Sequence, residues 1–427
     1  MPILPKRRSA AIAAAVVATL IALSGCSAQQ TVDIDVPAQT DATLPAETTA
    51  DLEAAVTAAM TATGSSGAIV GVWAPWSGSW VAGLGTQSLA GGEAVSTDMN
   101  FRAADVTRAM TCDVLYRVAE EGTVSLDDVV TTYVAAVPEL GGVTLRQLCD
   151  STSGVGSYAG QLQSLFMGNP DRVWNPRELA SYGLAQRAAD SIPGTAFRDS
   201  DAGYLLLGLA LERAKNESIQ TLIADYVAEP LQLPATSLPA DAAQTPGAGA
   251  VLDGYWSVPN AEGAWNCTDP ADFTTLSATV GGADSGVVTN ITDLGRYAQA
   301  LASGALTSND QQRFASPLPV AADQPTWFTA AGGAYQAGSL VGQFGSTPGY
   351  ITAAFADPET GMSIAVVLNN SGANASIGAW LAWELAAIAS KAPAASGQTA
   401  PEAGLPWTAQ QWHDQIAANA ICAAPAA

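Results

Sequence analysis

Residues 101–130 read FRAADVTRAMTCDVLYRVAEEGTVSLDDVV, and this stretch decides the fold of the 427-residue chain. A helix is expected to follow Asp105, because Asp is a preferred N-cap residue. Arg108 comes three residues later, at a spacing that brings an acidic and a basic side chain together on a helix. The sequence therefore predicts an ion pair at the start of a helix.

Four further stretches accompany this one: VTLRQLCDSTSGV (143–155), PGTAFRDSDAGYLLLG (193–208), ADSGVVTNITDLGRY (283–297) and QFGSTPGY (343–350). Together the five stretches resemble the motif segments of the serine β-lactamase (class C) and DD-peptidase family, over about residues 48–392. The resemblance implies an α/β fold of the α+β type, in which helices flank an antiparallel sheet. The active site would lie in the cleft between that sheet and a helical lobe.

In that family a serine is the nucleophile, a lysine takes its proton, a tyrosine relays the proton, and a third strand motif helps to seat the substrate. Carried over position by position, the serine becomes Asp105 and the lysine becomes Arg108. The tyrosine and asparagine of the second motif become Asp199 and Asp201, and the histidine of the third becomes Gln343. The resemblance therefore implies that the polar catalytic residues are substituted while the glycine, proline and apolar framework is kept.

These substitutions remove the chemistry that the family uses. Arg108 stays protonated at any biological pH, so it cannot act as a general base. No S-x-x-K and no G-x-S-x-G motif occurs in the chain, and its single histidine, His413, is expected on the surface of a helix outside the resemblance. The serines of the motif loops are expected to serve as turn and cap residues, and they are Ser151, Ser153 and Ser200.

Asp105, Asp199 and Asp201 are expected to converge with Arg108, and Arg198 is a further candidate for the same cluster. Three roles are open for it. The cluster could be a salt-bridged plug, a binding pocket for a cation such as calcium or a ligand amine, or a paired-carboxylate hydrolase. No dedicated metal site and no cofactor are predicted.

The N-terminus predicts export and a lipid anchor. A basic segment and an apolar run at residues 10–22 precede Leu23-Ser24-Gly25-Cys26, and this order is typical of a lipoprotein signal peptide, residues 1–25, with Cys26 as the lipidated residue. An ordinary secretory signal is the alternative. Residues 26–47 are rich in Thr, Ala, Asp and Pro and predict a flexible tether. The protein is thus expected to be extracytoplasmic and anchored to the bacterial cell membrane.

The remaining chain is expected to be one domain, residues 48–392, followed by a linker and short helix at 393–427. Its sheet part comprises about residues 48–103 and 270–392, and its helical lobe comprises about residues 104–269. The formal net charge of −23 repels phosphate backbones, so nucleic-acid binding is excluded.

Four cysteines follow Cys26, namely Cys112, Cys149, Cys267 and Cys422. An even number in an exported chain predicts two disulfides, with three possible pairings, and the spacing does not fit a zinc site. The family fold brings the turn that carries Cys149 near the helix after Asp105. The resemblance therefore implies a Cys112–Cys149 bond and leaves Cys267–Cys422.

We therefore expect a cell-envelope lipoprotein that is catalytically inactive. It would bind a cell-wall peptide or a cation in its cleft, or act as a scaffold. The alternative is an enzyme of the same serine-hydrolase family, of β-lactamase, D-Ala-D-Ala carboxypeptidase or esterase type, which acts through non-standard residues.

Overall fold

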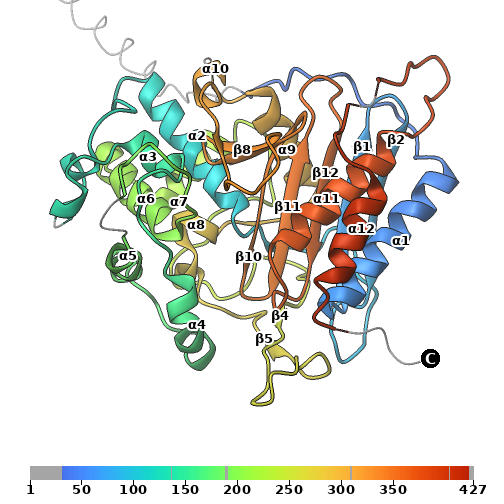
Figure 1. Cartoon of the computed structure of the whole chain (residues 1–427), viewed down its shortest axis with the longest axis horizontal. Coiled ribbons are helices and arrows are strands. Elements are labelled where there is room, and N and C mark those ends of the chain that lie inside the picture. The colour runs from blue at the N-terminus through green and yellow to red at the C-terminus, as the bar shows by residue number, and fades with distance from the viewer. Residues whose placement is uncertain (1–30, 136, 188–190, 308–309, 403, 423–427) are drawn as a thin grey trace, which may run out of the picture. The chain divides into compact units, whose positions relative to one another are not determined.

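The computed structural model describes residues 31–135, 137–187, 191–307, 310–402 and 404–422 (Figure 1). The predicted signal peptide and the predicted lipidation site Cys26 lie outside the described residues.

An antiparallel sheet organises the chain, with strand order β2-β1-β12-β11-β10-β9-β8-β7. Its strands are β1 (Gly67–Ala74), β2 (Gly78–Gly85), β7 (Leu318–Pro319), β8 (Phe328–Ala331), β9 (Ala334–Ala337), β10 (Leu340–Thr347), β11 (Tyr350–Ala356) and β12 (Ser363–Leu368). Strand β1 pairs with β12, so that Ile69 lies opposite Val367. The expected sheet of segments from both ends of the chain is therefore confirmed. Two short ladders join β3 (Phe101–Arg102) to β6 (Val288–Thr289) and β4 (Tyr255–Trp256) to β5 (Ala271–Asp272).

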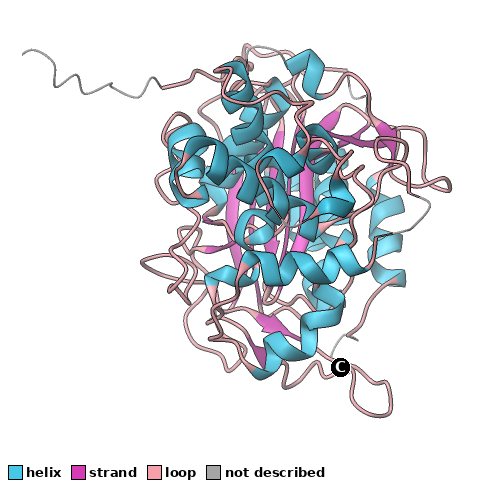
Figure 2. Cartoon of the chain, turned by 90° about the vertical axis from the view of Figure 1, so that its left-hand side faces the viewer, coloured by secondary structure: helices cyan, strands magenta, loops and turns pink. Residues whose placement is uncertain are grey.

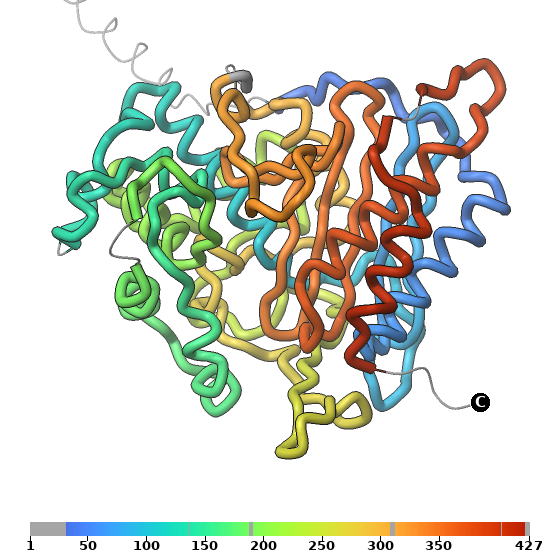
Figure 3. The backbone as a smooth tube through the Cα atoms, in the orientation of Figure 1, coloured from blue at the N-terminus to red at the C-terminus, as the bar shows by residue number. Residues whose placement is uncertain are grey.

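Helices cover both faces of this sheet, as the tube in Figure 3 and the side view in Figure 2 show. On one face lie α1 (Ala46–Thr63), α11 (Ser376–Ala389) and α12 (Ala409–Ala418), and on the other lie α2 (Val106–Glu120), α9 (Ile291–Ser303) and the lobe. The remaining helices are α3 (Leu145–Cys149), α4 (Ala159–Gly168), α5 (Pro176–Ala185), α6 (Asp201–Lys215), α7 (Ile219–Ile223), α8 (Gly282–Ser285) and α10 (Asp310–Arg313).

The alternation of side chains along each strand explains why the protein has two cores. In β1, Val70 and Val72 pack in the core under α1 and α11, whereas Ile69 packs in the core shared with α2 and the lobe. Both faces are buried, and for that reason β11 and β12 are apolar almost throughout.

The prediction of a free tether over residues 26–47 is wrong for the part that the structure describes. The amide of Val32 donates to the carbonyl of Pro230 (2.9 Å), and the backbone of Ala42 and Leu44 bonds to Ser79 in β2. Helix α1 already begins at Ala46. Polar composition concealed the alternating apolar residues of this segment, which pack onto the domain.

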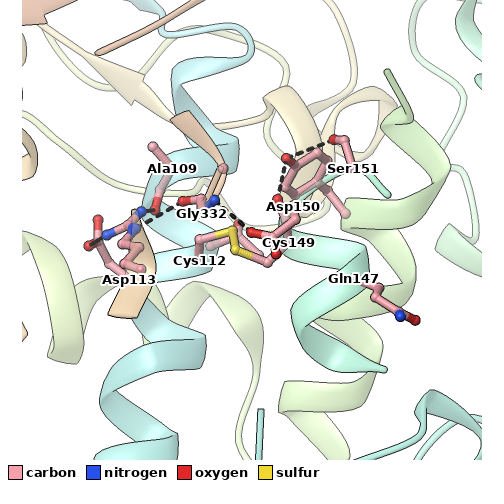
Figure 4. The surroundings of a disulfide bond; sticks show 12 residues. Ala109, Cys112, Asp113, Gln147, Cys149, Asp150, Ser151 and Gly332 are labelled. Atoms are coloured by element: carbon pink, nitrogen blue, oxygen red, sulfur yellow. Dashed lines mark hydrogen bonds and ion pairs between the residues drawn. A yellow bond between two sulfur atoms is a disulfide. The ribbon is translucent and has the colours of Figure 1, made fainter. Parts of the chain in front are cut away.

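Both expected disulfides are present. Cys112 in α2 is joined to Cys149 at the end of α3, and Cys267 is joined to Cys422 after α12 (Figure 4 shows the first bond). Disulfides belong to oxidising compartments, so the domain is extracytoplasmic.

Candidate functional site

The site begins at the turn that leads into α2. Ala104 has φ of 49°, a left-handed conformation that is costly for a residue with a Cβ. Asp105 follows as the N-cap position, but its side chain makes no capping hydrogen bond, which corrects the expected cap. A Cβ on Gly345 in β10 would lie 2.1 Å from the Asp105 Cγ. The Asp105 carboxyl therefore needs a glycine at this point of the strand.

Arg108 is at the centre of the site and binds three carboxylates. Its Nη1 lies 3.3 Å from Asp105 Oδ2 and 2.5 Å from Asp199 Oδ1, and its Nε donates to Asp284 Oδ1 (2.7 Å). The guanidinium also lies over the ring of Tyr204, 5.1 Å from its centroid. The predicted convergence of Asp105 and Asp199 on Arg108 is correct, and these contacts fix the guanidinium in place.

Asp284 is a partner that the sequence analysis missed. Helix α2 holds the segment around it, because Thr111 donates to the carbonyl of Ala283 (2.7 Å) and Thr107 accepts from the amide of Val287 (3.1 Å). A signal was present in the sequence. In the stretch 283–297, Asp284 stands where the resembled motif has a glycine.

The cluster is electrostatically unbalanced, and the pKa values reflect this. Burial raises the pKa of Asp105 well above its usual range, and the charges of Asp284 and Asp199 add to the effect against the opposing charge of Arg108. Burial also raises the pKa of Asp284. Although burial alone would lower the pKa of Arg108, the charges of its three partners raise it well above the ordinary value. Arg108 is therefore a permanent cation.

Asp201 lies beside the cluster and does not form an ion pair with Arg108. It is the first residue of α6, after the N-cap Ser200, and its carboxylate accepts from the amides of Tyr158 (2.7 Å) and Ala159 (3.0 Å) at the start of α4. Burial, and then the charge of Asp284, raise the pKa of Asp201 to about 7, although Arg108 and these amides lower it. Asp201 is therefore a carboxyl group that titrates near neutral pH.

Three other sequence candidates make no hydrogen bond or ion pair with the cluster, although Gln343 lines a small cavity with Arg108 and Asp199. Arg198 donates to the carbonyls of Gly154 (3.2 Å) and Gln186 (2.9 Å), so it is not a partner of the carboxylates. Gln343 is buried in β10, where it donates to the Gly333 carbonyl (2.8 Å). His413 in α12 contacts the buried Glu384 (3.0 Å), and its side chain is 42% exposed.

The three serines of the motif loops, predicted to be turn and cap residues, make local contacts. Ser200 caps α6 by accepting from the amide of Gly203 (3.0 Å), and Ser153 accepts from the amide of Val155 (3.3 Å) within its turn. Ser151 has φ of 54° and contacts the hydroxyl of Tyr204 (3.0 Å). All three thus serve local structure.

A second buried arginine, Arg313 of α10, reaches the same helix α2 one to two turns after Arg108. Arg313 is paired with Asp113, and both side chains are 2% exposed. Its other groups donate to the carbonyls of Gly332 (2.9 Å) and Ala109 (3.0 Å), and Tyr297 donates to the second oxygen of Asp113 (2.6 Å). Figure 4 shows three members of this network, Ala109, Asp113 and Gly332, beside the Cys112–Cys149 bond.

Two large cavities meet at the cluster, and a third, of about 10 Å³, borders Arg108 and Asp199 beside Gln343. The smaller of the two large cavities, of about 280 Å³, is lined by Arg108, all four carboxylates and the end of β10. The larger, of about 510 Å³, extends from Asp105 and Asp199 between β8, β10, α11 and α12. Both linings include Asp105, Asp199 and Ala375, so the two cavities adjoin at these residues.

Within the parts of the chain that the structure describes, no group of three or more His, Cys, Asp or Glu side chains is arranged to hold a metal ion. None of the helices in these described parts is both long enough and apolar enough to span a bilayer.

Comparison with known proteins identifies the fold. A family model described as Beta-lactamase matches residues 52–387. Among solved structures, a D-stereospecific amidohydrolase from Streptomyces sp. is 22% identical, with a TM-score of 0.65 over 77% of this chain and 95% of that one. A penicillin-binding protein homologue from Pyrococcus abyssi, described as octameric, is 21% identical, with a TM-score of 0.66 over 78% of this chain and 75% of that one.

A D-amino acid amidase from Ochrobactrum anthropi SV3 is 19% identical, with a TM-score of 0.62 over 75% of this chain and 91% of that one. Among curated proteins, a probable fimbrial assembly protein FimD, serogroup H1, of Dichelobacter nodosus is 28% identical over 140 residues, which are 32% of this chain. The chain spans only 34% of the length of that relative.

Proposed function

Because the chain belongs to the β-lactamase family, we propose that it is a cell-envelope member whose cleft binds a ligand and no longer performs acyl transfer. Lipid on Cys26 anchors it to the membrane. The observation that carries the proposal is the closed cluster in which Arg108 binds Asp105, Asp199 and Asp284.

Acyl transfer needs a nucleophile and a base to activate it. The position that resembles the nucleophile holds Asp105, whose carboxylate is a poor nucleophile toward amides. The position that resembles the base holds Arg108, which is a permanent cation with its Nε and Nη1 engaged. At these two positions, no group is present to attack the substrate as the family nucleophile does or to take up the proton as the family base does.

One observation favours an enzyme that acts through other residues. Asp201 lines the smaller cavity and has a pKa of about 7, which suits general acid–base catalysis. However, backbone amides occupy its carboxylate, and among the described residues no side-chain hydroxyl donates to it. We therefore favour binding over catalysis.

Intact-mass measurement tests the proposal. The purified protein is incubated with benzylpenicillin or with a D-Ala-D-Ala ester, beside a family enzyme that has the serine nucleophile. The mass of this protein is expected to stay unchanged while the control enzyme gains one acyl group. A stoichiometric adduct on any residue of the cleft would overturn the proposal.

A restored variant sharpens the result. Asp105→Ser with Arg108→Lys is expected to remain without substantial activity. Asp199 and Gln343 stay in place of the family's proton relay and third motif, and Asp284 would still hold the new lysine as a paired cation. Full acylation of this double variant would show that the two substitutions alone account for the lost chemistry.

A further inference from the structure

The larger cavity is strongly aromatic. Eight of its nineteen lining residues are Phe, Tyr or Trp, although aromatic residues make up only 7% of the chain. Trp327, Trp383 and Trp412 lie in ring contact, with the Trp383 and Trp412 centroids 4.9 Å apart. Such a lining suits the apolar body of a ligand, since aromatic rings bury a large area and prefer other rings or cations as partners.

Helix α12 supplies one wall of this cavity through Trp412 and Gln415. The helix lies beyond residues 52–387, which match the family. It is held against α11 because the indole of Trp407, in the preceding turn, donates to the carbonyl of Trp383 (3.0 Å). The Cys267–Cys422 bond ties the segment that follows it. This appendage is therefore a fixed part of the cavity.

The inner end of the cavity is negative. Among the residues that line the two cavities, Arg108 is the only basic one. The acidic ones are Asp105, Asp199, Asp201 and Asp284. The side chain of Asp199 is 53% exposed, whereas that of Asp105 is 17% exposed. Asp199 thus presents an accessible carboxylate where the aromatic lining begins, so a cationic group is favoured there and an anionic group is repelled.

We infer that this cavity binds a primary amine carried by an aromatic or branched apolar group, with the ammonium on Asp199 and the apolar group against Trp380, Trp383 and Trp412. The inference rests on the proposed function and names the ligand class of that site. It also makes α12 part of the binding site.

Calorimetric titration with three probes of nearly equal shape tests the ligand class. Phenethylamine carries the cation, 2-phenylethanol is its neutral counterpart, and 3-phenylpropionate carries an anion. The amine is expected to bind at least about tenfold more tightly than the alcohol, because a charge-assisted hydrogen bond replaces a neutral one. The propionate is expected not to bind. Equal affinity for amine and alcohol, or binding of none of the probes, overturns the inference.

Two variants locate the ligand. Asp199→Asn is expected to reduce amine affinity about tenfold and to leave alcohol affinity unchanged, whereas the exposed Asp171→Asn is its control. Trp412→Ala is expected to weaken both probes, with Trp265→Ala as the matched control, since Trp265 is 39% exposed and does not line the cavity. If Trp412→Ala does not fold, Trp380→Ala takes its place. Unchanged binding in the cavity variants overturns the inference.

The two proposals fail separately. Loss of amine selectivity overturns the ligand class even when benzylpenicillin leaves the mass unchanged, and that unchanged mass still supports the absence of acyl transfer. An acyl adduct overturns the proposed function whatever the calorimetry shows.

Discussion

Helix α2 carries two buried arginine clusters, and they differ in charge balance. Around Arg313, one carboxylate meets one guanidinium, and a tyrosine and two carbonyls take up the remaining groups. Around Arg108, three carboxylates share one guanidinium, and a fourth, Asp201, lies beside them. The second cluster borders three cavities, and neither Arg313 nor Asp113 lines any of them.

The difference separates a structural ion pair from the proposed binding site. A buried pair with balanced charge and satisfied hydrogen bonds holds segments together and leaves no unpaired charge or hydrogen-bonding group for a ligand. A cluster with more carboxyl groups than cations beside a cavity costs stability unless some carboxyls take up protons, which the raised pKa values of Asp105 and Asp284 favour, or another cation arrives. Four measurements test this distinction.

Arg313→Ala is expected to have the largest effect, a loss of about 4 kcal/mol in the free energy of unfolding. It leaves Asp113 buried without its counter-ion and two carbonyls without donors. Denaturant titration measures the loss, with the exposed Arg177→Ala as a control that should change stability by less than about 0.5 kcal/mol. Equal stability of the two variants would show that the Arg313 pair does not support the fold.

Arg108→Ala is expected to cost less, about 3 kcal/mol at pH 8. Asp199 is half exposed and can be hydrated, and the raised pKa of Asp105 already favours uptake of a proton. The cost should shrink as the pH falls, because burial raises the pKa of Asp105 and of Asp284 and so favours their protonated forms. Thermal melts with and without chelator complete the test. A variant as stable as wild type in chelator would contradict the model of the cluster, and destabilisation of the wild type by chelator would point to a bound cation.

Asp201 is expected to make stability depend on pH. Its pKa in the folded protein is raised from 3.8 to about 7, so the folded state keeps a proton that the unfolded state has lost. This contribution is complete below about pH 4 and disappears as the pH rises through 7. Between pH 5 and pH 8, wild type should lose on the order of 2 kcal/mol more than Asp201→Asn. Parallel pH profiles of the two proteins would refute the assignment.

Asp105→Asn is expected to have the smallest effect, below about 1 kcal/mol. The side chain caps no helix amide, and an amide oxygen can still accept from Arg108. The comparison with Arg108→Ala in the same denaturant titration is decisive, because a cost as large as that of Arg108→Ala would mean that the Asp105 charge is required.

Much of the fold and part of the site could be predicted from motifs and spacing. The cysteine count predicts two disulfides and the spacing predicts the contact of Arg108 with Asp105, whereas the family resemblance of the five stretches implies the disulfide pairing and the approach of Asp199 to Arg108. In each case the backbone framework determines which side chains meet.

The other features of the site depend on contacts between residues far apart in the sequence, which no local sequence pattern predicts. Asp284 reaches Arg108 from 176 residues away, and Arg313 reaches Asp113 from 200 residues away. The environment of Asp201 depends on where α4 begins, because its partners are backbone amides that any residue could supply. The aromatic cavity needs side chains from β8, β10, α11 and α12 at once, and composition cannot show that they face one another.

The position of α12 after the sheet strands in the sequence bears on when its wall of the cavity can form during biogenesis. A chain that emerges from the export channel N-terminus first releases every strand of the sheet before Trp412 and Cys422. The strands can pair at that stage, but the wall that α12 supplies is still missing, and its covalent tie to Cys267 forms only after oxidation outside the cytoplasm. The wall that α12 supplies to the proposed ligand cavity is therefore expected to form last when the chain is exported N-terminus first.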